Sequence, residues 1–205
     1  MDNYRNFGIT ILNDRPCEDE ATIIVVGVPR SGTSMIAASL IALGVPMGDR
    51  MDDAVYEDTQ MAGALDKPEA LARAIGQRNA KFPKWGFKRP LAFVNMAKDL
   101  RSFRKPRLVI PFRDSAAIAM RNVISMRFDF VPALGLAVRQ TVQLSDFIRD
   151  VTVPTMVVSY EKAISNPSVF TEELSTFCAV ENKPAALEVI VNGPPRYLEK
   201  ARLKD

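Results

Sequence analysis

The chain has 205 residues, of which 47% are hydrophobic and 25% charged, and its formal net charge is +3. This length predicts a single domain over residues 1–205 with enough apolar side chains to bury a core. The chain contains no histidine, which excludes a Ser-His triad, a histidine general base and histidine metal ligands.

The predicted elements follow one another as strands and helices along the chain. Ile9 and Ile11 alternate with Thr10, so residues 1–20 are expected to form an edge strand, a hairpin or an arm. Buried strands are predicted at residues 22–26, 85–88, 107–112 (broken near its end by Pro111) and 154–160. Helices are predicted at residues 32–43, 67–80, 114–126, 132–150 and 184–192. A further helix is expected to begin at residue 90. Two short helices are expected after residue 160, one of which follows residues 166–167. Residues 45–66 are expected to be an acidic loop.

This alternation predicts the fold class. Strands that alternate with helices form a parallel sheet with helices on both faces. We therefore expect an α/β fold of three layers, with a central and mainly parallel sheet flanked by helices.

The most informative segment is the loop between the first buried strand and the first long helix. Gly27 and Gly32 have the spacing of a phosphate-binding loop, and Ser34 stands where that pattern asks for Ser or Thr. The lysine position holds Thr33, however, and the loop cation is Arg30. A nucleotide triphosphatase needs the lysine on the transferred phosphate, so this loop is expected to bind an anion for a different reaction.

Pro29-Arg30-Ser31-Gly32-Thr33-Ser34 resembles the 5′-phosphosulfate loop of sulfotransferases, which share the P-loop fold. The resemblance implies 3′-phosphoadenosine 5′-phosphosulfate (PAPS) as co-substrate, held by the six residues of this loop. The arginine form is similar to that of tyrosylprotein sulfotransferases and many bacterial members. A tight strand-to-helix turn without a ligand is the alternative.

A second motif follows the strand at residues 107–112. Arg113 and Asp114 resemble the family's 3′-phosphate segment, although Ser115 replaces its proline and Arg121 stands at its serine position. The resemblance implies that Arg113 binds the 3′-phosphate. Arg121 could supply a further cation to that phosphate, or a shifted register would bring Ser125 there instead. A plain ion pair of Arg113 with a neighbour is the alternative.

Two further segments extend the resemblance over most of residues 22–178. Trp85-Gly86-Phe87-Lys88-Arg89-Pro90 is similar to a Gly-x-Lys-Asp-Pro element, whose lysine lies beside the transferred sulfate and implies a catalytic Lys88. Tyr160-Glu161-Lys162, followed by Asn166-Pro167, resembles a segment with a structural role.

The remaining catalytic role is that of the base. Val55-Tyr56-Glu57-Asp58 resembles a bacterial stretch whose glutamate faces the acceptor, which implies Glu57 as the base, with Asp52 or Asp53 second. The alternative is an exposed, solvated acidic run. Arg30 and Lys88 are expected to stabilise the charge that builds on the departing nucleotide, and no metal is expected.

Basic residues gather between residues 78 and 107, with Phe82, Trp85 and Phe87 among them, a pattern that also occurs in nucleic-acid-binding proteins. We expect a solvated basic face instead, Lys88 excepted, and no nucleic-acid partner. The acceptor is expected to be a small molecule, a carbohydrate or a peptide.

Cys17 and Cys178 fit no metal or redox spacing, and the N-terminus shows no signal pattern. A membrane span needs about 20 apolar residues, which the stretch from Met35 to Met47 does not reach. A cytoplasmic protein with reduced thiols is therefore expected. The competing functions are a P-loop small-molecule or nucleotide kinase and a nucleotide-binding relative without catalysis.

Overall fold

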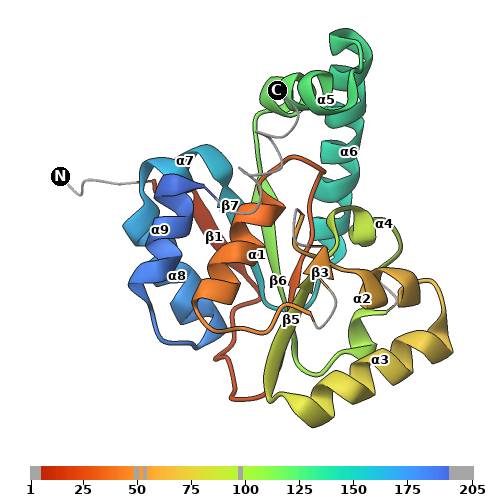
Figure 1. The fold of residues 1–205 in the computed structure, drawn as a ribbon, viewed down its shortest axis with the longest axis vertical. Helices are drawn as coiled ribbons and strands as arrows, with labels where there is room; N and C mark the ends of the chain where they lie inside the picture. The colour runs from red at the N-terminus through yellow and green to blue at the C-terminus, as the bar shows by residue number, and fades with distance from the viewer. Residues whose placement is uncertain (1–5, 49–50, 53–54, 97–98, 194–205) are drawn as a thin grey trace.

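A five-stranded sheet lies at the centre of the molecule (Figure 1). The structure, a computed structural model, describes residues 6–48, 51–52, 55–96 and 99–193. In sheet order the strands are β1 (Ile9–Leu12), β7 (Thr155–Ser159), β6 (Pro106–Phe112), β2 (Ala21–Val25) and β5 (Lys84–Lys88). β1 is an antiparallel edge strand, and the other neighbours pair in parallel, as the alternation of strands and helices predicts.

Helices cover both faces of this sheet. The α-helices are α1 (Thr33–Ala42), α2 (Thr59–Ala64), α3 (Pro68–Lys81), α4 (Phe93–Met96), α5 (Ser115–Met126), α6 (Phe130–Asp150), α7 (Tyr160–Ser165), α8 (Pro167–Cys178) and α9 (Pro184–Asn192). Two 3₁₀ turns, η1 (Pro90–Ala92) and η2 (Leu100–Ser102), and a short hairpin of β3 (Met51–Asp52) and β4 (Glu57–Asp58) complete the described elements. None of the helices in the described ranges is both long and apolar enough to cross a membrane.

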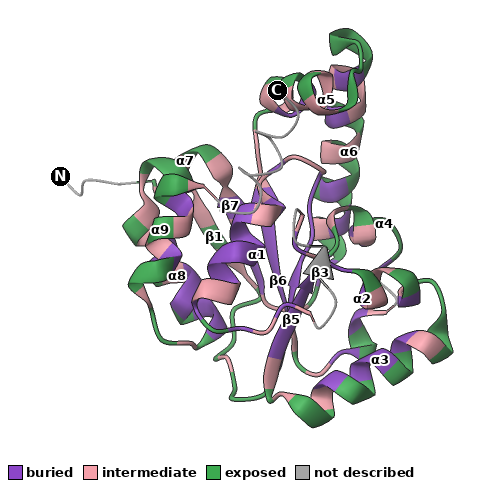
Figure 2. Cartoon of the chain, in the orientation of Figure 1, coloured by how far each residue is buried: buried purple, intermediate pink, exposed green. Residues whose placement is uncertain are grey.

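Strand β2 shows how the three layers arise from the sequence. Ile23 and Val25 pack into the core with α1, α8 and α9, whereas Ile24 packs into the opposite core with α3 and α6. All three side chains are fully buried, because successive side chains of a strand point to opposite faces. A strand covered on both faces therefore reads as one continuous apolar run. Figure 2 shows this burial along the central strands.

Strand β6 continues through Pro111, so the predicted break near its end is wrong. Its pairing with β2 ends at Val109, which faces Val25, and Val26 then donates to the Val109 carbonyl at 3.3 Å. Pro111 itself is paired only with Val158 of β7 in the described register. Proline lacks an N–H to donate, and it is tolerated here because β2 has already left the sheet.

The expectation of a loop over residues 45–66 is also wrong in its second half, where β4 and α2 form. Asp58 caps α2 by accepting from the backbone N–H groups of Gln60 at 2.9 Å and Met61 at 3.1 Å. Arg78 of α3 forms an ion pair with the same carboxylate, and both side chains are buried. A carboxylate that satisfies two helical N–H groups and one guanidinium is structural, not solvated.

The pair α5 and α6 stands out from the rest of the chain (Figure 1). α5 begins at its cap Asp114, which accepts from the Ala117 N–H at 2.7 Å, and it ends at Arg127 in the left-handed conformation. α6 begins at Phe130, two residues before the predicted start at Pro132. Pro132 fits the first turn of this helix, because a backbone N–H there would have no intrahelical acceptor and its absence costs no hydrogen bond.

The two cysteines meet although they are distant in sequence. The Cys17 thiol donates to the Cys178 carbonyl at 3.4 Å. Burial, and to a lesser degree the Cys17 thiol, raises the pKa of the Cys178 thiol to about 12, which leaves that thiol protonated at neutral pH.

The buried pair of Asp58 and Arg78 generates a stability prediction. Asp58→Ala leaves the Arg78 charge buried without its carboxylate partner and removes the cap of α2. The free energy of unfolding in urea should therefore fall by about 3–5 kcal/mol. Asp66→Ala, at an exposed position nearby, should change it by less than about 0.5 kcal/mol. Equal small losses in both variants would contradict a structural role for Asp58.

Candidate active site

The candidate site lies at the carboxyl ends of the parallel strands, where ligands bind in open α/β sheets. Four strands deliver residues to this edge. β2 runs into the loop of residues 26–32, β5 ends at Lys88, β6 ends just before Arg113, and β7 ends just before Tyr160. Parallel pairing therefore brings together motifs that lie up to about 130 residues apart in the chain.

The loop from β2 to α1 turns back sharply before the helix begins. Arg30 has a φ of 71° and Gly32 a φ of 105°, both in the left-handed region, and the Ser31 N–H donates to the Val28 carbonyl at 3.1 Å. A non-glycine residue rarely adopts such a φ unless its surroundings impose it. The turn presents the N-terminus of α1, where backbone N–H groups and the helix dipole favour an anion.

Both the backbone conformation at Gly32 and the closeness of a neighbouring side chain favour glycine at this position. A Cβ on Gly32 would lie 2.3 Å from Cδ2 of Tyr160, well inside contact distance. The Tyr160 ring in turn lies 4.4 Å from the guanidinium carbon of Arg113, in a cation–π contact. The absence of a side chain at Gly32 thus lets the loop, the end of β7 and Arg113 come together.

Lys88 is a buried cation at the end of β5, with 3% of its surface exposed. Its Nζ donates to Ser34 Oγ at 3.1 Å and to the Val55 carbonyl, and it lies 3.4 Å from Oε1 of Glu57. Buried ammonium groups persist when they are paired and hydrogen-bonded. Lys88 therefore joins the start of α1 and the segment before β4 to the sheet.

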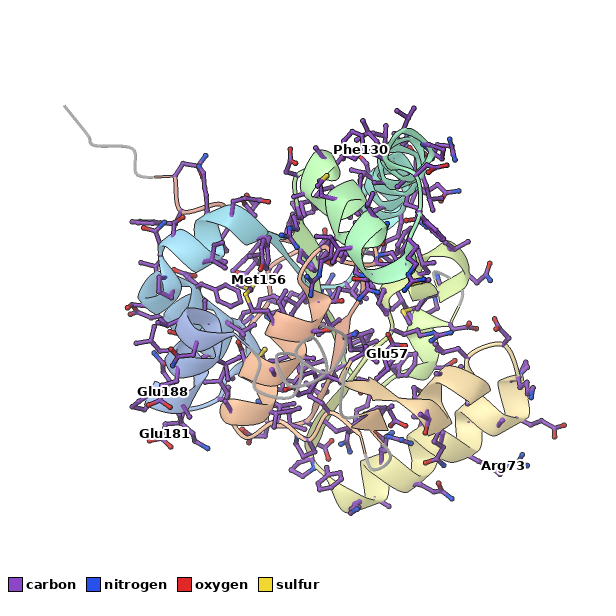
Figure 3. The ribbon with its side chains drawn as sticks, turned by 45° about the horizontal axis from the view of Figure 1, so that its top comes forward. Glu57, Arg73, Phe130, Met156, Glu181 and Glu188 are labelled. Atoms are coloured by element: carbon purple, nitrogen blue, oxygen red, sulfur yellow. The ribbon has the colours of Figure 1, made fainter. Side chains whose placement is uncertain are left out.

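Glu57 sits between two cations. Its Oε2 accepts from Arg89 at 2.8 Å while Oε1 faces Lys88, and 19% of its side chain remains exposed. Figure 3 shows Glu57 near the middle of the molecule, far from the peripheral Arg73 and Glu181. The carboxylate is thus oriented by two ion pairs and still reaches solvent, which excludes the fully exposed acidic run for this residue.

Arg113 completes the site on the side of Tyr160. It donates to the backbone carbonyl of Arg30 at 3.0 Å, so it braces the loop in its left-handed turn. The neighbouring Asp114 N–H donates to Glu161 at 3.1 Å. The ion pair of Arg113 with Asp114 that the sequence allows is not among the ion pairs of the described residues.

A cleft of about 660 Å³ connects these groups. The expected site residues that line it are Pro29, Arg30, Gly32, Thr33, Ser34, Glu57, Lys88, Arg113 and Arg121. Ser31 does not line the cleft in the described part of the chain; its hydroxyl is buried against Gly27 inside the loop. Such a volume is typical of small-molecule sites.

The alternatives that the sequence leaves open take different places. Arg121 of α5 lines the cleft, whereas Ser125 is not among its described lining residues. The backbone of Asp52 pairs with that of Glu57 across the short hairpin, and Asp53 lies outside the described residues. The structure thus brings Arg121 and Glu57 to the cleft.

Sequence reasoning missed part of the lining. The additional residues are Met35, Val55, Arg89, Pro90, Leu91, Asn122, Met126, Phe128, Leu136, Gln140 and Tyr160. Arg89 and Tyr160 lie inside motifs that the sequence already singles out, and their adjacency to Lys88 and to a strand end was the available signal. Met126, Phe128, Leu136 and Gln140 carry no such signal, because only the packing of α5 on α6 brings them to the cleft.

The expectation of a solvated basic face is wrong for several residues. Arg78 and Arg107 are buried, and Arg107 donates to the Arg15 carbonyl at 2.8 Å and lies over the Phe177 ring. Lys84 caps the end of α8 through the carbonyls of Cys178 and Ala179. Three aromatic residues of this stretch, Trp85, Phe87 and Phe103, form a buried ring cluster.

Comparisons with known proteins bear on the fold. No family model and no curated protein matches the sequence. Among solved structures, the sulfotransferase domain of the olefin synthase from Synechococcus PCC 7002 is similar, with a TM-score of 0.58 and 16% sequence identity over 91% of this chain and 82% of that domain. The chain therefore has the fold of a sulfotransferase domain, and the predicted α/β class with a central, mainly parallel sheet is confirmed.

The contact of Gly32 with Tyr160 yields a test of the loop. Gly32→Ala forces a methyl group into the tyrosine ring at a φ that alanine disfavours, so the free energy of unfolding should fall by about 1–3 kcal/mol. Gly76→Ala is the matched control, since Gly76 lies inside α3 with nothing within 4 Å of its added Cβ. That change should raise stability by about 0.5–1 kcal/mol. A Gly32→Ala variant as stable as the control would contradict the tight contact.

Proposed function

We propose that this protein is a sulfotransferase that moves a sulfuryl group from PAPS to a hydroxyl or amine of an acceptor, without a metal. One observation carries the proposal: an anion-binding loop without the kinase lysine lies in a cleft lined by Arg30, Lys88, Arg113 and Arg121. The sulfotransferase-domain fold supports it.

The residues present fit the anionic groups of PAPS. The backbone of residues 30–34 and the N-terminus of α1 suit the 5′-phosphosulfate, with Thr33 and Ser34 as hydroxyl partners and Arg30 as the loop cation. Arg113 and Arg121 would take the 3′-phosphate, since guanidinium groups match phosphate geometry. Arg113 donates to the Arg30 carbonyl from the neighbouring strand end, so the two proposed phosphate sites adjoin.

The proposed transfer is an in-line displacement. A lone pair of the acceptor oxygen or nitrogen forms the new bond to sulfur as the bond between sulfur and the 5′-phosphate oxygen breaks. The electron pair of the broken bond stays on that phosphate, which gives adenosine 3′,5′-bisphosphate (PAP). The acceptor proton goes to Glu57. Cations aimed at the departing oxygen stabilise the charge that develops there, the role we give to Arg30 and Lys88.

The contacts of Lys88 and Glu57 support these roles. Their 3.4 Å ion pair sets a carboxylate and an ammonium group side by side among the residues that line the cleft, so that an acid-base group and a cation can act on the same bound substrate. Arg89 holds the second oxygen of Glu57, which fixes the direction of the carboxylate. A kinase would instead need the loop lysine and a magnesium-binding aspartate at a strand end, where this chain has Thr33 and Arg113.

The nucleotide is the first test. PAP should raise the melting temperature in the presence of EDTA, because a ligand that binds the native state alone stabilises it, by about 2.7 kcal/mol at one hundred times its dissociation constant. AMP, which lacks the 3′-phosphate, should do much less, and Arg113→Ala should remove the preference for PAP. A larger shift with ATP and magnesium would replace this function by the kinase alternative.

The base gives a second test, in the transfer reaction. Glu57→Gln keeps the size of the side chain but cannot accept a proton, so transfer to an alcohol should fall by about 100- to 10,000-fold while the dissociation constant of PAP stays the same. Glu69→Gln, at an exposed position of α3, is the matched control and should retain full activity. PAP binding without transfer by the unaltered protein to any acceptor would favour a non-catalytic relative.

A further inference from the structure

The cleft has an apolar part that the proposed nucleotide site does not use. Four large apolar side chains line it: Leu91, Met126, Phe128 and Leu136. Leu91, Met126 and Phe128 remain 39%, 53% and 44% exposed, and Leu136 is half-buried. Single exposed apolar residues are common on proteins, but a group of them around one concave site indicates a binding surface.

These side chains come from two places in the fold. Leu91 belongs to η1, which begins at Pro90, directly after Lys88 and Arg89. It therefore lines the same cleft as Lys88 and Glu57, three residues after Lys88 in the chain. Met126 ends α5, Phe128 belongs to the connection, and Leu136 lies in α6. The α5–α6 pair thus forms a wall of the same cleft, and α6 also packs on α4, where Phe93 and Phe147 have ring centroids 6.0 Å apart.

The charges of the cleft leave little for a polar acceptor. The proposed nucleotide uses Arg30, Lys88, Arg113 and Arg121, and Arg89 is paired with Glu57. Among the described lining residues, the polar side chains left without an assigned role are Asn122, Gln140 and Tyr160, and Tyr160 packs on Arg113. An anionic acceptor would find no unassigned cation in this described part of the cleft, and burying a charge without a partner is costly.

We infer that the acceptor is an alcohol with an apolar carbon skeleton, whose hydroxyl meets Glu57 while its chain lies against Leu91 and the wall of Met126, Phe128 and Leu136. This inference rests on the proposed function and adds the substrate class. Burial of each methylene group between these side chains supplies the binding free energy, and Glu57 and Lys88 select the hydroxyl end.

A matched control exists on the same helix pair. Ile124 of α5 and Val131 of α6 are 67% and 75% exposed, yet neither lines the cleft in the described residues. Figure 3 shows the neighbouring Phe130 at the outer end of this pair, away from Glu57. A serine at position 124 therefore removes a comparable apolar side chain from the surface without changing the cleft.

The experiment measures sulfuryl transfer from PAPS to straight-chain primary alcohols from ethanol to octanol. The specificity constant kcat/KM should rise by up to about fourfold for each added methylene, the value for full burial, until the cleft is filled. Phe128→Ser should flatten this rise at the longer chains, whereas Ile124→Ser should reproduce the unaltered protein. The dissociation constant of PAP should be the same in all three proteins, because none of the changes touches the nucleotide part.

A second measurement separates this inference from the proposed function. Calorimetric binding of the same alcohols to the complex with PAP needs no turnover and should show the same dependence on chain length. If PAP binds and transfer occurs, but kcat/KM is flat along the series or sugars and tyrosine peptides are better acceptors, the inference fails and the proposed function stands. If Phe128→Ser weakens PAP, Phe128 serves the nucleotide and the inference fails. If PAP does not bind at all, the proposed function fails first.

Discussion

The buried ammonium of Lys88 is the constraint on which the site depends. A lysine charge cannot be left alone in the interior of a protein, and among the described residues Ser34, Val55 and Glu57 provide oxygen atoms around it. Satisfying that charge draws the segment after α1 back over the end of β5. The same contacts set Glu57 beside the start of α1, so one buried cation fixes both the path of the chain and the arrangement of charged groups in the cleft.

The register of the sheet positions Lys88 beside the loop that follows β2. Val25, the last residue of β2, pairs with Lys88 on one side and Val109 on the other. β2 then turns into the loop while β6 continues to Arg113, which reaches back to the Arg30 carbonyl. The loop is thus held between a cation from each neighbouring strand, which is the physical basis of the proposal that an anion with two charged ends binds at this edge of the sheet.

Local pattern was enough to predict the central elements of this fold, and the resembling motifs supplied nine of the residues that line the cleft. The apolar run of β2, the glycine spacing of the loop and the cap at Asp114 each depend on neighbouring residues, so they can be read from short stretches. The burial of Arg78 with Asp58 could not, because 20 residues separate the partners and an acidic run is more often solvated. The wall of α5 and α6 could not be predicted either, since Phe128 and Leu136 reach the cleft only through the packing of two helices.

A crystal structure of the protein with PAP tests the central claim most directly, namely that the cleft holds the nucleotide with its reacting end beside Lys88 and Glu57. The account predicts the 5′-phosphate on the backbone N–H groups of residues 30–34 with an oxygen facing the Lys88 ammonium, and the 3′-phosphate on Arg113. A nucleotide bound in the opposite direction, or with its 5′-phosphate remote from Lys88, would contradict the account.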